Sequence, residues 1–314
     1  MEKVDGKTAF ITGGASGMGL GMAKVFARHG MKVVIADVRQ GALDEAMSHL
    51  RETRGRVHPV KLDVTDRDAY ARAADEAERV FGKIHVLVNN AGVGVVGPMQ
   101  SATFKDWDFC MGVNVGGVIN GLVIVLPRIL AHGEEGHVVS TSSTGGFSAV
   151  GGAGLYCTSK FAVAGMMESL ATDLKGTPVG VSVFFPGPVT TNLAQTTQTV
   201  RPERLKNESE APRRPRPQLD ASGAPLNFAE IFMDPIEVGE RVLNGIRRGD
   251  LFIMSHPEFR AGLAARNDAL LRAIPEEPLN ARRQEAIKTF GTLLYNPIYD
   301  SQQPVTPPEG FPAR

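Results

Sequence analysis

The sequence predicts an α/β fold in which helices cover both faces of one doubly wound parallel sheet. Over residues 1 to about 190, short β-branched runs alternate with longer amphipathic runs. The β runs are almost continuously apolar, as expected for strands that are buried on both faces. A glycine-rich turn joins the first β run to the first amphipathic run. Right-handed crossovers between parallel strands then give the doubly wound arrangement.

The individual elements follow from these patterns and from their punctuation. Asp66 is the predicted N-cap of the third helix, and Gly30 and Gly82 are predicted to end helices. Strands are expected at 8–12, 32–37, 57–64, 83–90, 136–142, 179–187 and 250–255, and helices at 17–29, 40–52, 66–81, 103–131, 156–175, 234–249, 257–273 and 277–294. The tail from Pro297 is predicted to be extended, over the protein's own surface or over a neighbouring subunit.

The length of 314 residues fits one large domain with an extension. The predicted main domain covers residues 1–256, and a helical extension with a tail covers 257–314. Within the main domain, residues 190–235 form a substrate loop. Its part 190–229 is rich in Pro, Arg, Glu and Ser, and we interpret it as a mobile lid, with an idle insertion as the alternative.

The composition narrows the class of partner. The formal net charge is zero, with 34 basic and 34 acidic residues, which gives no electrostatic reason to expect a nucleic acid or an anionic membrane. Two cysteines do not form a disulfide framework and fit a reducing cytoplasm. The apolar stretch 115–127 is too short to span a membrane and is expected to stop at Pro127 as a buried core helix.

Two other possible sites are set aside. The seven histidines lack paired metal-ligand spacing, so no metal site is predicted. The basic cluster at 213–217 contains prolines and is interpreted as a solvated loop. A small-molecule ligand is the expected partner.

Five glycines crowd the turn between the first strand and the first helix: Gly13, Gly14, Gly17, Gly19 and Gly21. A strand that leads into a helix N-terminus presents free N–H groups and a positive dipole end, which suits a pyrophosphate. Asp37 ends the second strand, eighteen residues beyond Gly19, where a carboxylate binds the ribose 2′-hydroxyl of NAD. Asp37 therefore favours NAD over NADP, although Arg39 leaves a 2′-phosphate possible.

Polar residues after the later strands supply a candidate catalytic group. Tyr156 and Lys160 are four residues apart on one helix face, and a nearby ammonium favours the phenolate of a tyrosine. Ser143 follows the fifth strand, at the edge where open α/β sheets bind ligands, and Ser142 is the competing assignment. Asn114 lies among small apolar residues, where its amide is either a structural tie or part of the site. Cys157 is interpreted as a buried, inert thiol.

The motifs TGGASGMG, LDV at 62–64, NNAG at 89–92, STSSTGG, YCTSK and PGPVTT at 186–191, together with Asn114, resemble the short-chain dehydrogenase/reductase family. The resemblance covers residues 5–195 and 236–254 and implies a Rossmann-type fold and hydride transfer at a carbon that bears oxygen. It implies four catalytic residues. Tyr156 is the general acid/base, and Lys160 lowers the pKa of Tyr156 and holds the nicotinamide ribose. Ser143 binds the substrate oxygen, and Asn114 positions a water in a proton relay.

The same resemblance implies a set of cofactor-binding residues. Asp63 and Val64 are expected at the adenine, Asn90 near the ribose, and Val189 and Thr191 at the carboxamide. The full expected set is Gly13, Ser16, Gly17, Met18, Gly19, Asp37, Asp63, Val64, Asn90, Ala91, Gly92, Tyr156, Lys160, Pro186, Gly187, Val189 and Thr191.

A narrower likeness concerns bacterial Cα-dehydrogenases that oxidise the benzylic alcohol of lignin-type β-aryl ethers with NAD. It implies a bulky, aryl secondary alcohol as substrate, and the candidate walls are Phe147, Met99, Val95 and Phe228. The alternatives are a catalytically silent dinucleotide sensor, or a relative acting on a sterol, sugar or acyl-thioester ketone. The family further implies a homo-oligomer, dimer or tetramer, through the helices of Asn114 and Tyr156.

Overall fold

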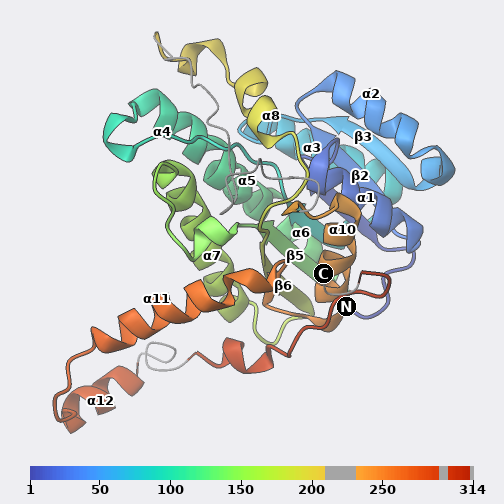
Figure 1. The fold of residues 1–314 in the computed structure, drawn as a ribbon. Coiled ribbons are helices and arrows are strands. Elements are labelled where there is room, and N and C mark those ends of the chain that lie inside the picture. Colours follow the sequence, from blue (N-terminus) through green and yellow to red (C-terminus); the bar gives the residue numbers. More distant parts are fainter. Residues whose placement is uncertain (209–230, 290–295, 312–314) are drawn as a thin grey trace.

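A computed structural model describes residues 1–208, 231–289 and 296–311. It contains one seven-stranded parallel sheet with the order β3-β2-β1-β4-β5-β6-β7 (Figure 1). The strands are β1 (Thr8–Thr12), β2 (Lys32–Asp37), β3 (Val57–Lys61), β4 (Val86–Asn89), β5 (Gly136–Thr141), β6 (Val179–Phe185) and β7 (Phe252–Met254). The chain reverses its direction of winding between β1 and β4, and this confirms the predicted doubly wound sheet.

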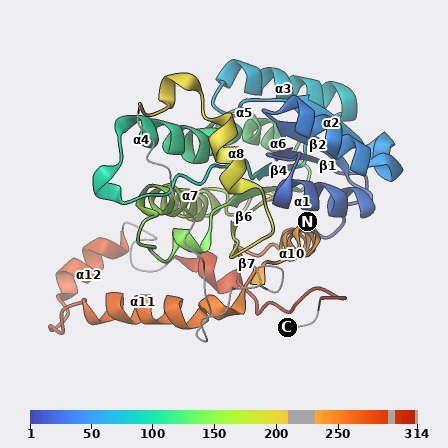
Figure 2. The ribbon, with the colours of Figure 1, turned by 45° about the horizontal axis from the view of Figure 1, so that its top comes forward.

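The described α-helices are α1 (Gly17–Arg28), α2 (Gln40–His49), α3 (Arg67–Phe81), α4 (Phe104–Met111), α5 (Gly117–Ile124), α6 (Leu126–Ala131), α7 (Gly154–Asp173), α8 (Leu193–Val200), α10 (Pro235–Arg248), α11 (Arg260–Arg272) and α12 (Ala281–Lys288). Seven of them form the layers on the two faces of the sheet. One buried core joins α1, α2 and α10 to the sheet. The other joins α3, α5, α6 and α7 to the opposite face, and the two layers are visible in Figure 2.

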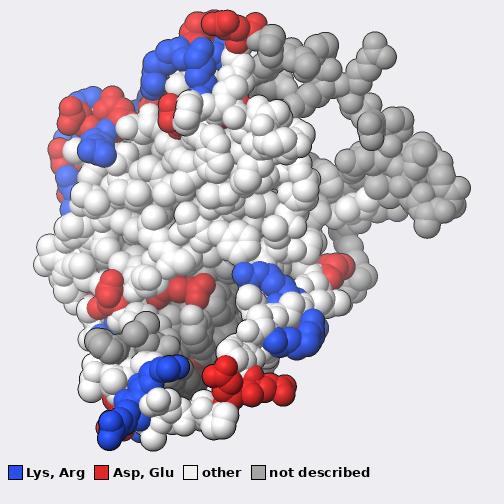
Figure 3. Space-filling model, turned by 90° about the vertical axis from the view of Figure 1, so that its left-hand side faces the viewer, with Lys and Arg blue, Asp and Glu red and all other residues white. Residues whose placement is uncertain are grey.

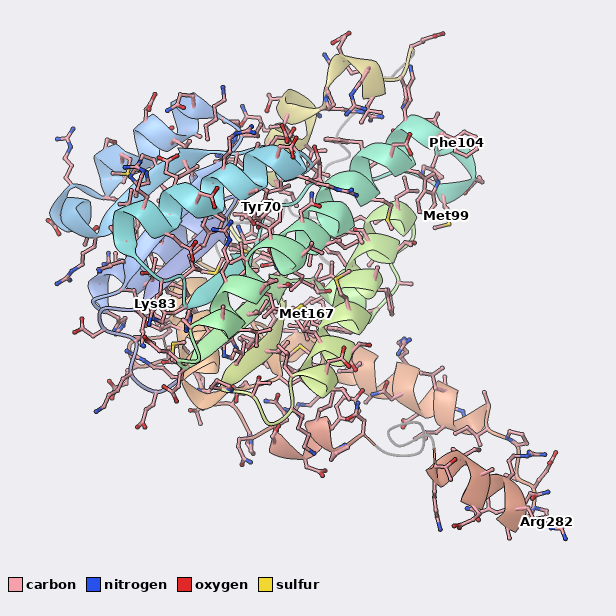
Figure 4. The ribbon with its side chains drawn as sticks, turned by 180° about the vertical axis from the view of Figure 1, so that it is seen from behind. Tyr70, Lys83, Met99, Phe104, Met167 and Arg282 are labelled. Carbon is pink, nitrogen blue, oxygen red and sulfur yellow. The ribbon has the colours of Figure 1, made fainter. Side chains whose placement is uncertain are left out.

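Each layer is anchored by large buried side chains. Phe26 of α1 is completely buried in the first core. In the second core, Tyr70 of α3 stacks on Phe10 of β1, with ring centroids 5.9 Å apart. Met167 of α7 lies in the same core and is labelled with Tyr70 in Figure 4. The apolar strand residues are therefore covered on both sides, as their near-continuous hydrophobicity predicts.

Local signals placed most of these elements correctly. The Asp66 carboxylate accepts a hydrogen bond from the Ala69 amide at 2.9 Å, which confirms the predicted N-cap. Gly30 and Gly82 follow α1 and α3 with φ values of 85° and 81°. The predicted helix 40–52 is too long, because α2 ends at His49 and a 3₁₀ turn, Arg51–Arg56, follows.

The helical run from Phe104 to Ala131 does not stop at Pro127 as expected. Pro127 lies in the first turn of α6, where a missing N–H is tolerated, and the helix continues to Ala131. A π-helical turn, Gly112–Gly116, separates α4 from α5. Within the described residues, this run is the one helix long and apolar enough to cross a membrane, and half of its most apolar window is buried in the protein. A core helix passes the same test.

The interpretation of 190–229 as a structureless loop is wrong for its first part. Residues 193–200 form α8, and a 3₁₀ turn, Glu203–Leu205, follows it. Residues 209–230 lie outside the described residues, and so do the cluster 213–217 and the candidate wall Phe228.

The C-terminal extension leaves the body of the protein and then returns. Helices α11 and α12 project from it and have no buried residues (Figure 1). The predicted extended tail instead begins with a 3₁₀ turn, Pro297–Ser301. There Tyr299 donates a hydrogen bond to Glu168 of α7 at 2.6 Å, and Gln302 accepts one from the Phe252 amide at 2.8 Å. The described tail thus lies against its own chain.

Candidate active site

A cavity of about 550 Å³ lies at the carboxyl ends of β1, β2 and β4. Most of the expected cofactor residues line it: Gly13, Ser16, Gly17, Met18, Asp37, Asp63, Val64, Asn90, Ala91, Gly92 and Thr191. The remaining six do not: Gly19, Tyr156, Lys160, Pro186, Gly187 and Val189. This cavity therefore has the lining expected of a cofactor cleft, and the proposed catalytic residues lie outside its lining.

The glycine turn fits an anionic group. Gly13 adopts a φ of 62°, which disfavours other residues. A Cβ on Gly19 would lie 2.1 Å from the Gly13 carbonyl oxygen, so Gly19 keeps α1 close to the strand end. Helix α1 begins without a side-chain cap and without an acidic residue in its first turn. Its positive end at Gly17 and Met18 faces the cavity, and this suits a pyrophosphate.

Thr12 ties the glycine turn to the end of β4. Its hydroxyl accepts hydrogen bonds from the amides of Asn90 and Ala91 at 3.0 and 3.1 Å. The Asn90 side chain donates in return to the Thr12 and Gly13 carbonyls at 3.0 and 3.3 Å. Thr12 is not among the site residues expected from the sequence, although it stands directly before the glycines.

Asp37 lies at the end of β2 and is buried, with 5% of its surface exposed. Its carboxylate is paired with Arg39, whose Nε and Nη2 atoms donate to the two carboxylate oxygens, each at 3.0 Å. Asp37 thus lies where a ribose-binding carboxylate is expected. The sequence left open whether Arg39 binds a 2′-phosphate, and in the structure Arg39 is paired with Asp37.

Ser143 lies beside Tyr156, whereas Ser142 does not. The Ser142 hydroxyl is completely buried and donates to the Lys160 carbonyl at 2.8 Å, which uses it inside the fold. Ser143 caps the turn after β5, and its hydroxyl lies beside the Tyr156 ring at Gly145. The buried bond of Ser142 favours Ser143 as the serine of the site.

Lys160 lies one turn after Tyr156 on α7. Its ammonium donates to the Thr141 carbonyl at 2.8 Å and lies 5.6 Å from the centroid of the Tyr156 ring. Burial of this lysine lowers its pKa to about 8.

The surroundings of Tyr156 raise the pKa of its phenol. Burial is the main cause, and the neighbouring Ser143 hydroxyl opposes the increase. The loss of solvent around the phenol outweighs the favourable neighbour, because burial penalises the charged phenolate.

Asn114 lies in the π turn and is 1% exposed. Its side-chain oxygen accepts from the Val93 amide at 2.8 Å, and its nitrogen donates to the Val93 carbonyl at 3.0 Å and to Ser159 at 2.9 Å. Gly92 fits between Asn114 and Lys160, since a Cβ there would lie 3.2 Å from the amide oxygen. The Asn114 side chain therefore connects the loop after β4 to helix α7.

Of the candidate walls, Phe147 has the best-defined surroundings. Its ring centroid lies 5.3 Å from that of Phe185 and 6.4 Å from that of Phe259. Met99 is exposed and lies beside Gly154 at the start of α7, and Val95 is half-buried. Both cysteines, Cys110 and Cys157, are free and buried. Among the residues that the structure describes, no group of three His, Cys, Asp or Glu is placed to hold a metal ion.

Comparison with known proteins identifies the family. A model of the short chain dehydrogenases matches residues 7–201. The chain belongs to the short-chain dehydrogenase family. It is 38% identical over 297 residues to the Cα-dehydrogenase of Sphingobium sp. strain SYK-6. The matched region covers 93% of this chain and 95% of that protein.

Solved structures of short-chain dehydrogenases have the same fold. One from Burkholderia phymatum, in complex with NAD, is 34% identical, with a TM-score of 0.77 over 89% of this chain and 100% of the other. LigO of Sphingobium sp. strain SYK-6 is 40% identical, with a TM-score of 0.75 over 92% of this chain and 98% of the other. These findings confirm the family and the fold that the motifs predict.

Proposed function

We propose that this protein is an NAD-dependent dehydrogenase that oxidises a bulky, aryl secondary alcohol to the ketone. The observation that carries the proposal is the placement of Tyr156 between Ser143 and Lys160, on a chain whose cofactor cleft ends at a buried carboxylate, Asp37. The NAD complex of the related Burkholderia structure supports the choice of cofactor.

Residues of the cleft would each hold a part of NAD. The N-terminus of α1 would bind the pyrophosphate, and Asp37 would accept hydrogen bonds from the adenosine ribose. Asp63 and Val64 would hold the adenine, and Val189 and Thr191 the carboxamide. Bound NAD supplies the hydride acceptor and a positive charge on its ring.

The catalytic residues handle the proton. Ser143 binds the alcohol oxygen, and Tyr156 takes the hydroxyl proton as general base. Lys160 holds the nicotinamide ribose and stabilises the phenolate, and Asn114 positions a water that carries the proton away. Because burial raises the pKa of Tyr156, the phenol needs the positive ring of NAD to become a base at neutral pH.

The substrate class rests on the relatives and on the aromatic surroundings of the site. The Sphingobium relative is named a Cα-dehydrogenase and matches nearly the whole chain, extension included. Phe147 follows Ser143 by four residues and packs in the buried core against Phe185 and Phe259, and we propose its ring as the surface beneath an aryl group.

We further propose that the protein is a cytoplasmic homo-oligomer. A broad surface almost without charged residues covers the side of the molecule that carries α4 and α7 (Figure 3). Phe104, Ile119 and Val123 on the helical run 104–131 are exposed, and apolar patches of this kind mark interfaces. The extension 257–314 is proposed as a separate part that lies outside the main domain 1–256.

The test is the reduction of NAD and NADP, followed by absorbance, with a panel of aryl and aliphatic secondary alcohols. The proposal expects turnover with NAD and aryl alcohols. Asp37→Ala should narrow the preference for NAD over NADP by about 10-fold or more, because the ribose loses its acceptor and a 2′-phosphate loses a repelling charge. A wild-type protein that prefers NADP, or that reduces neither cofactor with any alcohol, would contradict it.

A further inference from the structure

Arg39 connects three segments that lie far apart in the sequence. Its guanidinium donates to both oxygens of Asp37, to the Ser16 hydroxyl at 2.8 Å, and to the Thr196 hydroxyl at 3.2 Å. Asp37 ends β2, Ser16 lies in the glycine turn, and Thr196 lies on α8. The Arg39 side chain is 26% exposed, so these bonds are partly shielded from water.

The carboxylate of Asp37 is largely used by this contact. The Arg39 backbone amide adds a further hydrogen bond to Oδ1 at 3.1 Å. A carboxylate offers about four lone-pair sites, and Arg39 takes three of them. One site on Oδ2 remains, so a ribose that binds Asp37 through two hydroxyls has to displace a bond of the arginine fork.

Helix α8 forms part of the wall of the same cavity. Leu193, Thr196 and Val200 all line it, so α8 borders the cofactor cleft directly. Thr197 fixes α8 to the far side by accepting from the Gly94 amide at 2.8 Å. The Arg39–Thr196 bond is its tie to the cofactor side.

We infer that Arg39 is a positioning residue that couples the occupancy of Asp37 to α8. While the Arg39 guanidinium is paired with Asp37, it also holds α8 through Thr196. Ribose hydroxyls that bind the Asp37 carboxylate displace the guanidinium and so release α8. The inference rests on the proposed function only in that the ribose binds Asp37. Arg39 thereby competes with the cofactor and lowers its affinity, and the same coupling acts in reverse from α8 to the cleft.

Two variants separate this competition from a general attraction between Arg39 and the phosphates. Arg39→Lys keeps the positive charge but cannot form the two-pronged contact. Thr196→Val keeps the shape of the side chain and removes only the acceptor on α8. Thr199→Val is the matched control, because Thr199 is an exposed threonine of the same helix that bonds only its own helix backbone.

The experiment is a titration of each variant with NADH, followed by the fluorescence of NADH. Arg39→Lys should bind NADH at least about threefold more tightly than the wild type, because a charge-assisted competitor is removed. Thr196→Val should tighten binding by a smaller factor, and Thr199→Val should not change it. The double variant should equal Arg39→Lys alone, because Thr196 acts only through Arg39.

Unchanged or weaker binding in Arg39→Lys, or effects of the two changes that add in the double variant, would overturn the inference. Asp37→Ala separates this failure from a failure of the proposed function. If Asp37→Ala binds NADH as tightly as the wild type, the ribose does not use Asp37 and the proposed cofactor assignment fails. If Asp37→Ala weakens binding while Arg39→Lys does not tighten it, only the coupling by Arg39 is wrong.

Discussion

Two regions of the candidate site are built in different ways. The catalytic floor, defined as Asn114, Ser143, Tyr156 and Lys160, consists of largely buried side chains tied to neighbouring strands and helices. The lid, defined as residues 191–207, contains no buried residue in α8 and is held by polar side chains from distant segments. One of its ties is the ion pair of Arg201 with Asp106 of α4 at 2.8 Å.

The difference in burial suggests different roles: the floor holds the reacting groups, and the lid controls how the cofactor enters and leaves. A buried floor keeps the reacting groups in place but penalises their charged forms, as the shifted pKa values of Tyr156 and Lys160 show. We propose that the lid, which is held by a few ion pairs and hydrogen bonds, opens at a modest cost in free energy. Substitutions in the floor should therefore change the chemical step or the stability, and those in the lid should change cofactor exchange.

The largest expected effect is that of Tyr156→Phe. It should lower kcat by about 10²- to 10⁴-fold, because the proton acceptor is removed. NADH affinity should change little, because the cavity residues remain. Steady-state kinetics and NADH titration check the two parts. Tyr299→Phe is the matched control, since it removes a phenolic hydroxyl bonded to Glu168. Full activity in Tyr156→Phe would show that Tyr156 is not the proton acceptor.

Lys160→Met should inactivate the enzyme and yet stabilise its fold by about 1–3 kcal/mol at pH 7. The folded pKa of Lys160 is lowered from 10.5 to about 8. Between these values the unfolded wild type binds more protons than the folded one, so wild-type stability rises with pH there. The advantage of the variant should therefore be full below about pH 8 and shrink toward pH 10.5.

Denaturant unfolding at several pH values measures this difference. Lys206→Met is the control, because Lys206 is half-exposed and pairs with an exposed glutamate. Its effect should be small and should not vary with pH in the same window. A Lys160→Met protein that is less stable than the wild type at every pH would show that burial of the charged Lys160 does not destabilise the fold.

Arg201→Gln should have the smallest effect, an increase of about 3- to 10-fold in the rate of NADH dissociation with little change in the chemical step. Arg201 and Asp106 have exposed fractions of 9% and 14%, so their ion pair is shielded and the lid loses a real restraint. Stopped-flow displacement of NADH measures the rate. Glu203→Gln, which breaks only an exposed pair, is the control. Equal rates in all three proteins would mean that the lid does not limit cofactor exchange.

The same contrast explains what the sequence could predict. Strands β1 and β2 have the predicted bounds, because continuous apolar runs end at clear turn residues. Ser143 could be placed at the ligand-binding edge because it follows β5, and the family resemblance implied that Tyr156 acts beside it.

The lid could not be predicted in this way. Helix α8 is short and polar, and its ties to Arg39, Gly94 and Asp106 come from residues that lie far away in the sequence. The π turn at Asn114 was also not predicted, and the Asn114 amide there bonds Val93 and Ser159, which are 21 and 45 residues away in the sequence. The projecting α11 and α12 have helical sequences, but nothing local says that they leave the body.

The most direct test of the central claim is the pKa of Tyr156 with and without NAD. Ultraviolet difference titration of the wild type against Tyr156→Phe isolates this phenol from the other tyrosines. The account predicts a pKa above the ordinary value of 10.0 in the protein alone, because burial raises it, and a clear decrease when NAD is bound. The same pKa in both titrations would show that the cofactor does not make Tyr156 a base, and would contradict the proposed chemistry.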